Sequence, residues 1–139
     1  MKSLSRMLFL FGGIAAIGTM ALSAVTAATE TSGAAVVSAK FSGPKANTGT
    51  VSYAKEGMKH VLTLSADFKV PDTPDPHWML VDSKGTTYLL DKLMLKGDRV
   101  QRTITVPGYV GDVQKVVIWC AWAEANLGEA RFESVLETR

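Results

Sequence analysis

The chain has 139 residues, 47% of them hydrophobic, and its 15 lysines and arginines nearly balance 13 aspartates and glutamates. This length is enough for one domain with a modest core. The near balance of charge leaves no basic surplus to neutralise phosphates, which argues against a nucleic-acid partner.

Residues 1–27 are predicted to be a secretory signal peptide. Lys2 and Arg6 are the only charged residues before Glu30, residues 7–25 are apolar, and small residues follow. A basic start, an apolar run and small residues in that order are typical of a signal peptide. A retained membrane anchor is the alternative, but the second half of the run is rich in small residues and no basic cluster follows it. Cleavage removes both basic residues, so the mature net charge is zero.

We therefore expect a periplasmic or secreted protein with no membrane span after cleavage. No cysteine lies near the cleavage region, which excludes a bacterial lipoprotein anchor. Cys120 is the only cysteine of the chain, so the domain cannot form an internal disulfide. Its stability must come from packing, and the unpaired thiol needs an explanation.

Residues 28–34 are small and polar and are predicted to be a flexible lead-in to a single domain at 35–139. Eight short runs in that domain are rich in β-branched and aromatic residues: 35–41, 48–54, 60–66, 78–83, 86–90, 100–106, 114–122 and 130–135. Their period is near two, and turns that contain glycine separate most of them. This pattern predicts an all-β fold, an antiparallel β-sandwich of about eight strands.

Two stretches depart from the pattern. Residues 68–78 contain three prolines, and proline has no N–H for a strand ladder, so a loop or crossover is expected there instead of a central strand. Residues 121–130 have a helix-forming composition with Gly128 as a possible stop. Either one helical turn or a loop before the last strand fits them. The run 114–122 is apolar on both faces, which indicates a central strand, or one whose outer face meets a partner.

Cys120, between Trp119 and Trp122, is the first candidate for chemistry. A free cysteine among apolar neighbours packs as a small hydrophobe, and burial raises its pKa. No Lys, Arg or His lies within three positions to stabilise a thiolate. Packing and chemistry both remain open on the residues alone.

His60 and His77 are the only histidines. His60 shares strand parity with Leu62 and Leu64 and is expected at the mouth of the core, whereas His77 follows a proline. Together with Cys120 and a methionine, the two histidines are candidates for a soft copper or haem site. Neither histidine shows the spacing of a known ligand motif.

The remaining residue patterns give no clear sign of a catalytic or metal-binding site. The chain has no nucleophile–base–acid set, phosphate loop or dinucleotide fingerprint, so it is not expected to be a stand-alone enzyme. The acids around the proline loop lack the pattern of a calcium loop and are expected to be solvated or to cap N–H groups. Trp78, Trp119 and Trp122 are candidates for a sugar-binding platform, although core packing is favoured for at least one of the last two.

Five segments carry a resemblance to a known family: TGTVSYA, LTLSADF, PDTPDPHWMLVDS, LKGDRVQRTITVP and VVIWCAWAEANLGEA. Together they make residues 47–132 resemble the DM-thirteen domain, also called the electron-transfer DM-thirteen domain. The last segment is the most specific, because a strand ends in Trp119-Cys120 and Gly128 and Ala130 follow about ten positions on. Ala123 departs from the family, which often has an aromatic residue at that place.

The resemblance implies a β-rich extracytoplasmic domain with a redox or electron-transfer role. Its centre would be Cys120, as a reactive thiol or as a ligand to a prosthetic group such as haem, with Trp119 and Trp122 around it. A function without any cofactor is equally compatible. Because the family occurs with DOMON domains and membrane cytochromes, the implied partner is a membrane cytochrome or another redox protein of the envelope. The alternative is a non-catalytic binding module for a cell-envelope, carbohydrate or protein partner, which would use a sheet face and the loop 69–78, with Trp78 and His77 exposed.

Overall fold

The computed structural model describes residues 35–139, so the predicted signal peptide and lead-in lie outside the described residues. The described chain folds into strands joined by turns and loops. The strands are β1 (Val36–Val37), β2 (Val51–Glu56), β3 (Lys59–Leu64), β4 (Pro76–Val81), β5 (Thr87–Lys92), β6 (Thr103–Thr105), β7 (Asp112–Cys120) and β8 (Ala125–Glu137).

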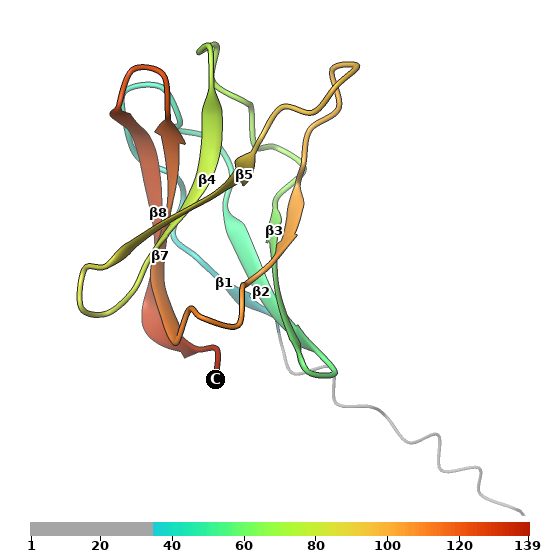
Figure 1. Cartoon of the computed structure of the whole chain (residues 1–139), viewed down its shortest axis with the longest axis vertical. Coiled ribbons are helices and arrows are strands. Elements are labelled where there is room, and N and C mark those ends of the chain that lie inside the picture. The colour runs from blue at the N-terminus through green and yellow to red at the C-terminus, as the bar shows by residue number, and fades with distance from the viewer. Residues whose placement is uncertain (1–34) are drawn as a thin grey trace, which may run out of the picture.

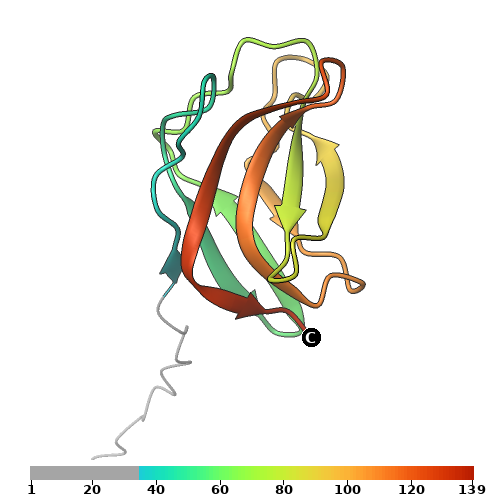
Figure 2. The ribbon, with the colours of Figure 1, turned by 90° about the vertical axis from the view of Figure 1, so that its left-hand side faces the viewer.

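The eight strands form two antiparallel sheets of four. The first sheet has the order β1-β2-β3-β6 and the second the order β5-β4-β7-β8. The two sheets pack face to face (Figure 1), and Figure 2 looks onto the second sheet. The predicted antiparallel β-sandwich of about eight strands is confirmed.

Alternation along the strands builds the core between the sheets. Leu62 and Leu64 of β3 point inward together with Ile104 of β6, and all three are buried. On β7, Val116 and Ile118 face the same core. The outer face of β7 is also apolar: Val117 is buried in a smaller cluster with Met79 and Val81 of β4. β7 lies between β4 and β8, as the prediction of a central strand requires.

The proline-rich stretch is a loop only as far as Asp75. Pro76 is the first residue of β4, which is a central strand, and this corrects the prediction of a loop through residue 78. Proline is tolerated there because the first residue of a strand need not donate to the ladder. The parity of β4 turns Trp78 inward, where it is 0% exposed and its Nε1 donates to the Gln101 carbonyl at 2.9 Å. The expected exposure of Trp78 is therefore wrong.

The ambiguous segment 121–130 is a tight turn followed by a strand. Residues 121–124 form the turn, Glu124 has a positive φ of 52°, and β8 begins at Ala125. Gly128 is therefore no helix stop. It lies within β8, where the backbone of Ala46 packs directly on its Cα.

The two lateral sides of the sandwich differ. On one side, residues 38–46 pass from the first sheet to the second: the Ser38 N–H donates to Val51, and the N–H groups of Ala39 and Ser42 donate to β8. On the other side, the edge strands β5 and β6 face each other across an open cleft. No helix in residues 35–139 has the length and apolar character needed to cross a membrane.

Candidate functional site

Cys120 is the last residue of β7 and lies at the end of the sandwich that carries the β7–β8 turn, at the top of Figure 1. It pairs with Pro76 of β4 on one side and Ala125 of β8 on the other. Its side chain belongs to the main core and is 0% exposed. The thiol is therefore covered by the turn that follows it and by the loop that precedes β4.

Within the described residues, one hydrogen bond reaches the sulfur. The Ala123 N–H donates to Cys120 Sγ at 3.5 Å, which folds the turn back over the strand end. This N–H contributes most to lowering the pKa of the thiol below its ordinary value. Burial opposes the shift, but the N–H groups of Asp75 and Trp122 and the Thr73 hydroxyl add to the lowering. Groups that donate to the sulfur favour its charged form, so together they outweigh the effect of burial on the pKa of the thiol.

Thr73 contributes a hydroxyl without a good partner of its own. Thr73 Oγ1 is buried and makes no hydrogen bond of good geometry to any described residue. It is nevertheless close enough to Cys120 to help lower the pKa of the thiol. A buried hydroxyl without a partner is costly, whereas a thiolate is a stronger acceptor than a neutral thiol. Ionisation of Cys120 would give this hydroxyl its partner.

Asp75 holds the donor loop in place. Its carbonyl accepts the Ala121 N–H at 3.0 Å, which joins the loop to the turn. Its carboxylate contacts Lys92 Nζ at 2.7 Å and His77 Nε2 at 3.1 Å. The hydrogen bond from Lys92 is the main reason that the pKa of Asp75 lies below its ordinary value, against the opposing effect of burial. Side chains of β4 and β5 thus fix the loop that places Thr73 and Asp75 near the sulfur.

The two neighbouring tryptophans do not enclose the sulfur. Trp119 faces the opposite side of the sheet, where it packs half-buried against Met79, Val81 and Val117. Trp122 is 75% exposed on the turn, because β7 ends at Cys120 and the strand parity expected for residue 122 is lost. The expectation that both tryptophans surround Cys120 is therefore not met by the geometry.

The histidines are far apart. His60 lies on the inner side of β3, as expected, but next to the β2–β3 hairpin at the opposite end of the molecule from Cys120 (Figure 1). Its Nδ1 is 2.7 Å from the Tyr53 hydroxyl. His77 is near the site, but its Nδ1 is bonded to the Leu90 carbonyl and its Nε2 to Asp75. Both ring nitrogens of His77 are thus occupied.

The residues around Cys120 do not assemble the copper site that Cys120, His60 and His77 were candidates to form. Within residues 35–139, no three His, Cys, Asp or Glu side chains are arranged to hold a metal ion. The sulfur faces N–H groups, which stabilise an anion but cannot act as ligands beside it. The Cys120 sulfur is the group with nucleophilic potential at this end of the sandwich.

Sequence reasoning named Cys120 as a candidate but did not predict the groups that lie around its sulfur. Thr73, Asp75 and Ala123 are distant in sequence or lie in the turn, and two of them act through backbone N–H groups that every residue has. The only sequence signal for these groups was the rigid, proline-rich PDTPDP stretch beside a predicted strand.

Comparison with known proteins adds no identification: no family model, no curated protein and no solved structure matches the chain.

Proposed function

We propose that this chain is an exported, single-domain redox protein whose reactive group is the Cys120 thiolate. The observation that carries the proposal is the hydrogen bond that the Ala123 N–H donates to the buried Cys120 sulfur at 3.5 Å, and the lowered pKa of the thiol agrees with it. A cysteine that served only as packing would need no such donor, and burial alone would raise its pKa. The resemblance to the DM-thirteen domain supports the same residue as the centre.

The chemistry that fits a lone activated thiol is thiol–disulfide exchange. The thiolate attacks one sulfur of a partner's disulfide, a mixed disulfide forms, and the partner's second sulfur leaves as a thiolate. This step needs no metal, haem or external electron carrier. Among the partners that the resemblance implies, a disulfide-bearing redox protein of the envelope therefore suits the site better than a cytochrome.

Access to the sulfur requires the 121–124 turn to move, since Cys120 is fully covered. The turn is short and carries Trp122, a large apolar side chain that is mostly exposed. A partner that binds the indole of Trp122 would contact the segment that covers the sulfur. We propose that docking and exposure of the thiol are coupled in this way.

The test is the pH dependence of alkylation by iodoacetamide, followed by mass spectrometry. Because Cys120 is the only cysteine, every adduct reports on it. We expect half-maximal rate at a pH below that of the same chain unfolded in urea, where a free thiol has a pKa of about 8.5. The form in which the 121–124 turn covers the sulfur predominates. The pH of half-maximal alkylation rate therefore reports the pKa of the thiol in the native chain, even when the reagent reacts only after the turn has opened.

A second arm uses oxidised glutathione as a model disulfide. We expect one glutathione adduct per chain, reversed by reductant and absent from Cys120→Ser. A midpoint equal to or above that of the unfolded chain, or a native chain that resists both reagents, would show that Cys120 is inert packing.

A further inference from the structure

The open lateral side of the sandwich carries a second site that Cys120 does not touch. A cavity of about 570 Å³ lies between the edge strands β5 and β6. Small-molecule sites typically have volumes of about 300–1,000 Å³. The junction at Gln101, whose N–H donates to the Leu93 carbonyl at 2.8 Å, joins the two walls at one end. The cavity is thus a cleft between two walls fixed by the fold.

The cleft has an apolar base and polar walls. Leu90 and Ile104 belong to the edge of the core and contribute to the apolar part of the cleft. Asp91 lines one wall and Gln101 the other, with Gln101 Nε2 donating to Asp91 Oδ2 at 3.3 Å. The hydroxyls of Thr103 and Thr105 add donors and acceptors on the β6 side. A carboxylate beside an amide and two hydroxyls is a dense set of groups for binding a ligand rich in hydroxyls.

An aromatic ring completes the lining. Tyr109 borders the cleft and is 65% exposed, so its ring is not used by the core. It is held by a tilted contact with Tyr88, with ring centroids 6.0 Å apart. An aromatic face of this kind suits the apolar C–H face of a sugar ring.

The charge of the lining narrows the ligand class. Asp91 is the only ionisable side chain other than Tyr109 that lines this cleft, and the lining contains no cation. A phosphate or a uronate would meet a carboxylate without compensation. An extended apolar peptide would bury the hydroxyls and the amide without partners. We propose that the cleft between β5 and β6 binds a neutral oligosaccharide, with Tyr109 stacking on a sugar ring and the Asp91–Gln101 pair binding its hydroxyls.

The experiment is an NMR titration of the ¹⁵N-labelled full chain with three neutral sugars, cellotetraose, maltotetraose and tetra-N-acetylchitotetraose. We expect saturable shifts of the Tyr109 and Gln101 signals with at least one of these sugars. Tyr109→Ala and Gln101→Ala should each weaken binding about tenfold, since each removes one stacking or hydrogen-bonding contact. Tyr109→Phe should retain binding because the aromatic face is kept.

Matched controls separate this site from the thiol and from the other exposed aromatic ring. Trp122→Ala and Cys120→Ser should leave sugar binding unchanged. The proposal is overturned by the absence of binding to all three sugars at millimolar concentration, by binding that survives Tyr109→Ala, by binding lost only in Trp122→Ala, or by tighter binding of tetragalacturonate than of any neutral sugar.

Discussion

At the scale of single residues, the pKa of the Cys120 thiol depends on uncharged groups. No cationic side chain is needed to lower the pKa of this thiol, because backbone N–H groups and one hydroxyl contribute instead. Such groups keep their orientation as long as the backbone does. The thiol should therefore respond to changes in the loop before β4 as strongly as to changes in its own strand.

Thr73→Val tests the role of the unpartnered hydroxyl. The change replaces the hydroxyl by a methyl group of the same shape, so the pKa of Cys120 should rise toward its ordinary value. The alkylation rate at neutral pH should fall several-fold. The free energy of unfolding should rise by about 1 kcal/mol, since the change removes a buried hydroxyl that has no hydrogen-bond partner.

Thr87→Val is the matched control, because Thr87 is exposed on β5. It should alter neither the alkylation profile nor stability. An unchanged pH midpoint in Thr73→Val would show that the hydroxyl does not act on the sulfur.

At the scale of elements, the stretch after β7 shows where composition misleads. Ala, Glu, Asn and Leu are common in helices, yet residues 125–137 form the longest strand of the described chain. Tertiary pairing decides the outcome, since β8 bonds both to β7 and to the segment 38–46. Gly128 suits a strand paired on both sides, because the lack of a side chain lets the backbone of Ala46 lie directly on that of β8.

Gly128→Ala is expected to destabilise the domain by at least about 2 kcal/mol, because a methyl group there would overlap the Ala46 carbonyl oxygen, which is backbone and cannot rotate away. Urea unfolding monitored by tryptophan fluorescence measures the change. Gly108→Ala is the control and should be close to neutral, since nothing lies within 4 Å of a Cβ at that position. Equal stability of the two variants would contradict the close packing of β8 on residues 42–46.

At the scale of the whole molecule, the alternation of apolar residues was sufficient to predict the β-sandwich, and the two apolar faces of 114–122 indicated the central place of β7 as one of two alternatives. Parity also placed His60 correctly on the inner side of β3. It failed for Trp122, because the end of a strand is decided by a turn such as that at Glu124 and not by side-chain pattern. The groups of Thr73 and Asp75 near Cys120 could not be predicted, since their loop meets Cys120 only in the folded chain, and the Ala123 N–H reaches the sulfur only once the 121–124 turn has formed.

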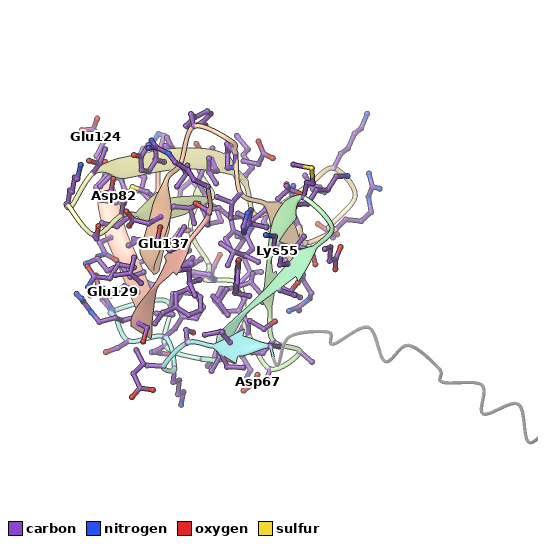
Figure 3. All side chains as sticks on the ribbon, turned by 90° about the horizontal axis from the view of Figure 1, so that it is seen from below. Lys55, Asp67, Asp82, Glu124, Glu129 and Glu137 are labelled. Carbon is purple, nitrogen blue, oxygen red and sulfur yellow. The ribbon has the colours of Figure 1, made fainter. Side chains whose placement is uncertain are left out.

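Acid stability is a further property of the whole molecule. Burial raises the pKa of Asp82, but hydrogen bonds from the Thr86 N–H and the Tyr88 hydroxyl outweigh it, and the net pKa lies below its ordinary value. The pKa of Glu129 is lowered chiefly by the Lys115 ammonium, and that of Asp67 by the Ser65 hydroxyl. Figure 3 shows that Asp67, Asp82 and Glu129 lie apart from one another, so we expect their effects to add.

A carboxyl whose pKa is lower in the native state than in the unfolded state binds fewer protons when folded. It contributes stability above its unfolded pKa, and this contribution is lost as the pH falls toward the native pKa. The free energy of unfolding should therefore fall steadily below about pH 4, the range of ordinary carboxyl pKa values. Urea unfolding between neutral pH and pH 2 measures this slope.

Asp82→Asn should lower the free energy of unfolding at neutral pH and flatten its dependence on pH in acid. Glu133→Gln, at an exposed position on β8, should do neither. Equal slopes in the parent chain and Asp82→Asn would mean that hydrogen bonds to Asp82 do not favour its ionised form.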